Sequence, residues 1–155
     1  MKDVSVINNE TRMEGLNELK DCYYITAIDR SGNESAPSNI VCIDNCPYYE
    51  LPNVFTPNGD NVNETFQAFD NPYAKCPRFV EAVAIKIYNR WGVLVHDYNS
   101  AQASENNIFI NWDGKDQNDN DLPSGTYYYE VIVLFDVLDE NRRQQKIKGT
   151  VQLVK

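Results

Sequence analysis

Histidine is almost absent from this sequence of 155 residues, in which His96 is the only one. Catalysis by serine or cysteine needs a base and an orienting group within reach, and histidine is the usual base. His96 falls inside a predicted strand beside Asp97, where a polar tip at the sheet surface is far commoner than a catalytic role. The Gly-x-Ser-x-Gly motif of serine hydrolases is also missing. The sequence therefore predicts a protein that is not an enzyme.

Positive charge is scarce too, with 14 lysines and arginines against 23 aspartates and glutamates and a net charge of −9. Nucleic-acid binding requires clustered basic side chains that displace counterions. Docking on an anionic membrane needs the same kind of patch. The charge balance argues against both classes of partner.

Long hydrophobic runs are missing, since no stretch approaches 18 consecutive apolar residues. We therefore expect no insertion into a membrane. No apolar segment follows Met1 and Lys2, so no signal peptide is visible. If the protein is exported, we expect that its signal has been removed or that this chain is one end of a longer one.

Cysteine is sparse, and Cys22, Cys42, Cys46 and Cys76 are widely spaced. An even count suits two disulfides in an oxidising compartment. Free buried thiols are a second interpretation. Zinc binding is the weakest, because Cys42 and Cys46 form one loose pair and no second pair follows. The separations favour two local bridges, Cys22–Cys42 and Cys46–Cys76, among three formal pairings.

No convincing amphipathic helix longer than two turns is present, and alternation of apolar and polar residues dominates instead. Turns rich in Gly, Asn and Pro separate the alternating segments. We expect strands over residues 22–29, 40–43, 51–55, 79–89, 91–98, 107–112, 125–136 and 146–155. Their core faces are predicted to be Val83, Ile85 and Ile87; Tyr127, Tyr129, Val131, Val133 and Phe135; and Ile147, Val151 and Leu153.

This pattern predicts an all-β protein, an immunoglobulin-like β-sandwich of about seven strands. Residues 1–45 hold too few strands for an independent domain. We interpret them as the end of an immunoglobulin-like or fibronectin type III-like domain. Residues 46–155 form the main domain, and the boundary lies within residues 44–52.

An acidic, asparagine-rich loop follows the expected strand at 51–55. Its side chains offer oxygen ligands of the kind that calcium prefers, and the candidate ligands are Asn58, Asp60, Asn63 and Glu64. The spacing is not that of an EF-hand. Asn and Asp also bond to their own backbone in turns without any metal. A turn and a structural calcium site both remain open.

Four ordered blocks ending at the last residue carry a family resemblance: "LPNVFTPNGDNVNETF", "CPRFVEAVAIKIYNRWGVLVHD", "NWDGKDQNDNDLPSGTYYYEVIVL" and "KGTVQLVK". Over residues 46–155 the chain resembles the gliding-motility-associated C-terminal domain, the type B sorting domain of type IX secretion in Bacteroidetes. It departs from the family pattern at Asn61, where a glycine is usual, and at Glu64, where an aspartate is usual.

The resemblance implies a non-catalytic sorting domain that directs export of a larger protein across the outer membrane. The implied partners are the type IX export machinery or its shuttle proteins. The implied locations are the periplasm in transit and then the cell surface or the extracellular space. We expect the domain to be a monomer.

We further expect the last strand to be read at a sheet edge by backbone pairing, with candidate recognition residues Lys146, Lys148, Gly149, Val151, Leu153 and Lys155. The alternative function is a calcium-dependent adhesive or carbohydrate-binding β-sandwich at a cell surface. A purely structural spacer is a third possibility.

Overall fold

Strands and loops make up the part of the chain that the computed structural model describes, residues 20–70 and 77–155. The seven strands, in chain order, are β1 (Asp21–Tyr23), β2 (Val41–Ile43), β3 (Val54–Phe55), β4 (Val80–Tyr88), β5 (Leu94–Asn99), β6 (Gly125–Phe135) and β7 (Gln144–Leu153). Within these ranges no residue is helical, and a membrane-crossing helix is accordingly not found there. The prediction of an all-β protein is confirmed.

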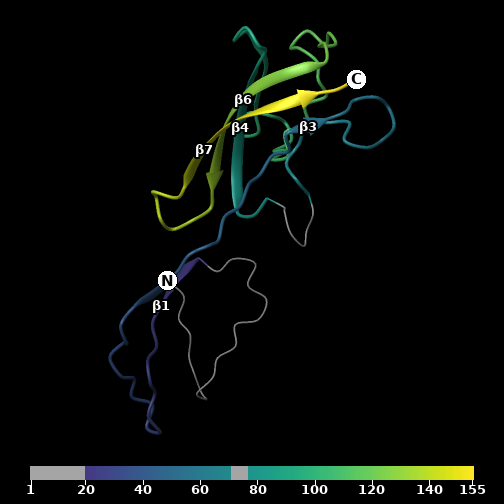
Figure 1. The fold of residues 1–155 in the computed structure, drawn as a ribbon. Helices are drawn as coiled ribbons and strands as arrows, with labels where there is room; N and C mark the ends of the chain where they lie inside the picture. Colours follow the sequence, from purple (N-terminus) through teal and green to yellow (C-terminus); the bar gives the residue numbers. More distant parts are fainter. Residues whose placement is uncertain (1–19, 71–76) are drawn as a thin grey trace.

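Five of the strands form one sheet in the order β3-β7-β6-β4-β5, and β1 and β2 form a separate hairpin. Neighbours in the larger sheet are antiparallel, except that β3 runs parallel to the end of β7. Figure 1 shows the hairpin at one end of the molecule and the C-terminus at the other. Because β3 pairs with β7, the first and last strands of the main domain are neighbours in space.

The core faces follow the alternation in the sequence, because successive side chains of a strand point to opposite faces. The inward residues of β4 and β6 are buried, with Val83, Ile85, Val131 and Val133 at most 1% exposed. Val151 and Leu153 of β7 complete the same surface. The predicted core faces are confirmed, with Tyr129 and Ile147 partly buried at the margin.

The layer that covers this sheet is made mostly of loop segments. Phe66 and Trp112 form an isolated antiparallel bridge, with N···O distances of 2.8 and 3.1 Å. Their rings pack against Phe55 of β3 at centroid distances of 6.1 and 5.2 Å. The strand expected at 107–112 is reduced to this bridge, because Ile110 and Asn111 have positive φ angles of 81° and 61°, which interrupt an extended backbone. The sandwich thus has one regular sheet and one irregular layer.

A buried tyrosine at the start of β6 supports the immunoglobulin-like assignment. The Tyr127 hydroxyl donates to the Pro123 carbonyl, four residues upstream, at 2.8 Å. Immunoglobulin-like sandwiches carry a comparable tyrosine corner near the start of one of their strands. The bond anchors the loop that leads into β6.

The small hairpin is closed by a disulfide. Cys22 and Cys42 lie directly opposite each other in the β1–β2 ladder and are bonded, as predicted. Cys46 is exposed and has no disulfide partner among the described residues. Cys76 lies outside the described residues, so the Cys46–Cys76 bridge stays a prediction.

Replacing Tyr127 by Phe should lower stability, because the part-buried hydrogen bond between the Tyr127 hydroxyl and the Pro123 carbonyl is lost. We expect a loss of about 1 kcal/mol, or a fall in melting temperature of roughly 2–8 °C, in a thermal melt followed by circular dichroism. Tyr128→Phe is the matched control, since Tyr128 is 51% exposed. Equal melting temperatures for the two variants would contradict a structural role for this bond.

Candidate functional site

Within residues 20–70 and 77–155, one side of β7 is largely free of strand pairing. β7 pairs with β6 through ten residues, from Gln144 to Leu153. On its other side, the strand pairing that these residues provide is limited to β3, at Gln152 and Leu153. In Figure 1 the end of β7 lies beside β3, while its first part runs away from that short strand. We call the free side of Gln144–Thr150 the open edge.

The backbone groups that face this edge follow from one hydrogen bond. The Gln152 N–H donates to the Asn53 carbonyl at 2.8 Å, so it points away from β6. Backbone direction alternates along a strand, and the β6–β7 register is continuous. The N–H and C=O groups that point outward therefore belong to every second residue: Gln144, Lys146, Lys148 and Thr150.

The side chains of those same residues lie on the solvent face of the sheet. Lys146 and Lys148 flank Glu130 of β6, with N···O distances of 2.6 and 3.1 Å. Hydrogen bonds from Lys146 and then Lys148 hold the pKa of the Glu130 carboxyl below its usual range. Their ammonium groups remain accessible, with side chains 48% and 68% exposed.

The other predicted recognition residues have different surroundings. Val151 and Leu153 are core residues. Gly149 lies under Tyr129, and a Cβ there would come within 2.5 Å of the tyrosine hydroxyl oxygen. Lys155 forms an ion pair with Asp121 at 2.7 Å, and this contact holds the pKa of Asp121 below its usual range. Of the six residues, Lys146 and Lys148 alone combine an exposed side chain with a place on the open edge.

The candidate calcium loop is organised by its own hydrogen bonds. The Glu64 carboxylate accepts from the Asn61 and Gly59 N–H groups at 2.9 and 3.1 Å. Asp60 accepts from the Val62 N–H at 2.8 Å and from the Asn58 amide at 3.1 Å. These contacts are those of an asparagine- and aspartate-rich turn.

Asn63 of the same loop adopts a positive φ of 53°. No group of three or more His, Cys, Asp or Glu side chains with metal-binding geometry occurs among the residues described. Calcium binding by Asn58, Asp60, Asn63 and Glu64 remains a prediction.

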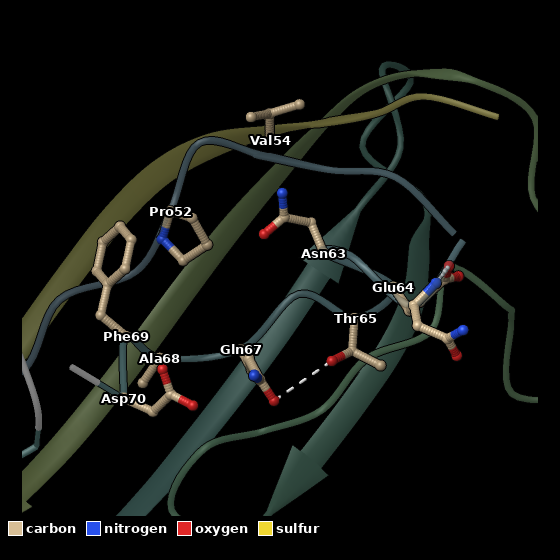
Figure 2. A pocket seen from close by; sticks show the side chains of 10 residues that line it. Pro52, Val54, Asn63, Glu64, Thr65, Gln67, Ala68, Phe69 and Asp70 are labelled. Carbon is tan, nitrogen blue, oxygen red and sulfur yellow. Dashed lines mark hydrogen bonds between the residues drawn. The ribbon is translucent and has the colours of Figure 1, made fainter. Parts of the chain in front are cut away.

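A hollow of about 310 Å³ lies beside this loop. Figure 2 shows side chains that line it, from Pro52 and Val54 on one segment and from Asn63 to Asp70 on another, and the Thr65 hydroxyl donates to the Gln67 amide oxygen. The lining includes Pro52, Phe69 and the carboxylates of Glu64 and Asp70 but no histidine or cysteine. The hollow offers no nucleophile–base pair.

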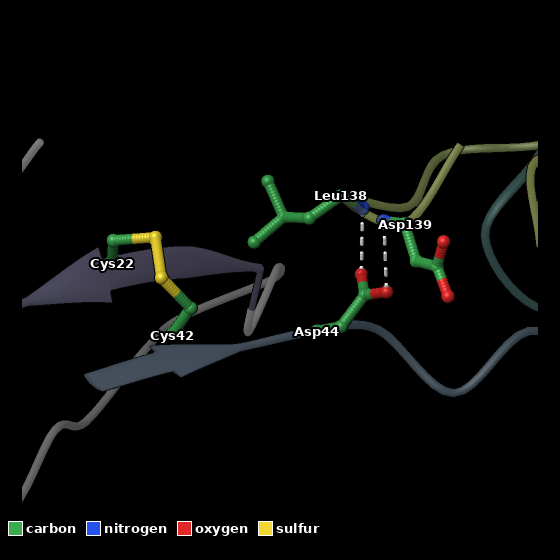
Figure 3. The surroundings of a disulfide bond; sticks show 5 residues. All are labelled: Cys22, Cys42, Asp44, Leu138 and Asp139. Carbon is green, nitrogen blue, oxygen red and sulfur yellow. Dashed lines mark hydrogen bonds between the residues drawn. A yellow bond between two sulfur atoms is a disulfide. The ribbon is translucent and has the colours of Figure 1, made fainter. Parts of the chain in front are cut away.

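Asp44 and Asn45 join the hairpin to the main domain, and sequence reasoning missed this role. Figure 3 shows the Asp44 carboxylate accepting from the N–H groups of Leu138 and Asp139, at 2.8 and 3.3 Å. Although desolvation opposes the shift, these backbone donors hold the pKa of Asp44 below its usual range.

Asn45 makes a second set of contacts across the same junction. It is 1% exposed, donates to the Asp136 carbonyl at 2.7 Å and accepts from the Lys20 N–H at 3.2 Å. Lys20 and Asp136 also form an ion pair. The residues on either side of the predicted boundary therefore hold each other in place.

His96 lies on the core side of β5, not with its tip at the sheet surface. It pairs with Ile87 of β4, and its ring centroid is 5.9 Å from that of Trp112. Its Nε2 is buried and has no hydrogen-bond partner within the described part of the chain. Burial lowers the pKa of His96, against the opposing effect of the Asp113 and Asp97 carboxylates.

Comparison with known families adds the decisive observation: residues 49–153 match the CHU_C type IX secretion signal domain. The chain belongs to this family. The match covers the whole five-stranded sheet, including the open edge, and confirms the resemblance seen in the sequence. Searches of curated proteins and of solved structures returned no significant match.

Membership in this family assigns a sorting role and an interaction with the secretion machinery in general. It also implies export to the cell surface or the extracellular space. Families of secretion signals are in general non-catalytic.

The signal domain should lose stability in mild acid because of His96. A lowered folded-state pKa means that the unfolded chain binds the proton more tightly, so stability is present above the unfolded value of about 6.5 and is lost as pH falls below it. The measurement is the urea midpoint at pH 7.5 and pH 5.5. His96→Gln should show a smaller difference between the two values, and an unchanged difference would contradict the assignment.

Replacing Asn45 by Ala should destabilise the junction, because the Asp136 carbonyl and the Lys20 N–H, in part-buried hydrogen bonds, lose their partner. We expect a loss of about 1–3 kcal/mol in chemical denaturation. Asn39→Ala is the control, since Asn39 is exposed. If both variants unfold at the same denaturant concentration, the junction contacts do not stabilise the protein.

Proposed function

We propose that this signal domain directs the export of a larger protein across the outer membrane, and that the export machinery or a shuttle protein reads the open edge of β7. The observation that supports the proposal is a regular strand, inside the family match, with outward backbone groups on four alternate residues. An extended segment that adds to such an edge gains main-chain hydrogen bonds without requiring a pocket.

The route of export follows from the same proposal. The domain folds in the periplasm, crosses the outer membrane with its cargo, and reaches the cell surface or the medium. The Cys22–Cys42 disulfide is of the kind that forms in the oxidising periplasm. Secretion as a monomer requires that the open edge does not pair with copies of itself.

Neither acidic loops nor an active site is needed for this function. Calcium in the Asn58–Glu64 loop, if bound, would stabilise the turn beside β3 rather than act on a substrate. The adhesive alternative would need an aromatic platform beside the acidic loops. Of the aromatic side chains that the structure describes, the most exposed is Trp91 at 74%. It packs instead under Arg90, whose guanidinium carbon lies 4.7 Å from the ring centroid.

Deleting the end of β7 would not test edge recognition, because Val151 and Leu153 are core residues. A single proline at Lys148 is sharper. The Lys148 N–H points outward, so proline there removes an outward donor and blocks close approach while leaving the bonds to β6, and prolines are tolerated at such edge positions.

We expect a secreted reporter fused to residues 1–155 to reach the medium in a type IX-competent cell. Lys148→Pro should reduce secretion by about tenfold or more, on the scale of a few lost main-chain hydrogen bonds. Lys148→Ala, which removes the charge but keeps the N–H, is the matched control and should be secreted well. Full secretion of a folded Lys148→Pro fusion would show that the edge is not read.

A further inference from the structure

We infer that the open edge selects an extended partner segment in which acidic and apolar side chains alternate. This inference rests on the proposed function, because it specifies the chemistry of the segment that pairs with β7. It is carried by three features: the charges on the outer side of the edge, the apolar surface on its inner side, and the repulsion that disfavours a second copy of the chain.

The outer side of the edge is locally basic on an acidic protein. Residues 142–148 contain four of the chain's 14 lysines and arginines and no acidic residue. Lys146 and Lys148 are two residues apart and so lie on the same face of the sheet. Side chains directly opposite each other in paired strands have Cβ atoms about 4.5–5.5 Å apart. Acidic residues at alternate positions of an added strand would therefore face both lysines.

The inner side of the same edge is apolar. Ile147 is partly buried against the core and lies between the two lysines in sequence. Gly149, two residues further along, presents no side chain, so the ring of Tyr129 occupies the space above it. A strand added beside β7 would place its intervening side chains against this surface. Apolar residues at these positions would extend the core, whereas charged residues would be desolvated without a partner.

A second copy of β7 is a poor occupant of the edge. In an antiparallel pair centred on Ile147, Lys146 of each copy would face Lys148 of the other. Like charges directly opposite each other destabilise a strand pair, and lysines on edge strands are a known device against self-association. The same two lysines that repel a copy of this strand would attract an acidic one.

Glu130 already pairs with the two lysines that an acidic partner would contact. Its carboxylate lies between the two ammonium groups and neutralises part of their charge in the free protein. Removing that charge should leave both lysines available to the incoming strand. The Glu130→Gln variant is therefore expected to bind an acidic segment more tightly than the unmodified protein. If the ion pairs of Glu130 were purely structural, their loss would not raise this affinity.

Binding is tested with the full chain and the capped heptapeptide Thr-Val-Glu-Val-Glu-Val-Thr, whose symmetric pattern fits either strand direction. Amide chemical shifts should change mainly along residues 144–150. We expect affinity roughly tenfold higher than for the same peptide with lysine in place of both glutamates, from two cross-strand charge pairs. Lys148→Glu should abolish this preference, because either peptide would then face one attractive and one repulsive side chain. Lys115→Glu, which makes the same charge change in the loop before β6, where Lys115 pairs with Asp119, is the matched control and should keep it.

Three results would overturn the inference. They are equal affinity for the two peptides, chemical-shift changes located away from β7, and no binding of either peptide. The export assay separates this outcome from failure of the proposed function. If Lys148→Pro blocks secretion while Lys148→Glu is secreted normally, the edge is read without selection for acidic side chains. If Lys148→Glu is blocked and Lys148→Ala is not, the acidic partner is supported.

Discussion

The ten-residue ladder between β6 and β7 is the interaction on which the other features depend. Because β7 pairs with β6 in an unbroken register over all ten of its residues, it is held in the sheet from one side and its opposite side can stay open. The same register brings Lys146 and Lys148 to Glu130 and buries Val151 and Leu153. A strand that anchored itself by its side chains alone could not present a regular row of outward N–H and C=O groups.

The irregular layer solves a different problem, which is to close the core without a second regular sheet. Trp112 does this by contacting Phe55, Phe66 and Tyr127, at centroid distances of 5.2 to 6.4 Å. Its indole N–H donates to the Lys115 carbonyl at 2.8 Å, so the ring is buried without an unpaired donor. Large aromatic rings supply the area that short segments would otherwise lack. The loops around them are then free to carry turns and charges.

Local patterns predicted most of the fold. Alternation identified the segments now seen as β4, β6 and β7 to within a few residues, because each has one buried and one solvated face. The strand expected at 107–112, around the apolar residues Ile108, Phe109 and Ile110, did not form, because Ile110 and Asn111 have left-handed backbone angles. The parallel pairing of β3 with β7 and the contacts of Asp44 and Asn45 with residues 136–139 join positions more than 90 residues apart. No local pattern encodes such pairings, and the openness of the β7 edge depends on them.

An exposed strand edge is hazardous for a protein that must stay soluble until it meets its export partner. Burying the edge would prevent pairing with other exposed strands, but it would also hide the backbone groups that the proposed export partner recognises. Lysines on alternate residues offer another solution, since they penalise pairing between identical edges yet leave the backbone groups accessible. In the proposed mode of recognition, charge decides which strand pairs with the edge, and the backbone supplies the binding energy. In this arrangement solubility before recognition and selectivity during recognition come from the same two side chains, so neither can be changed without affecting the other.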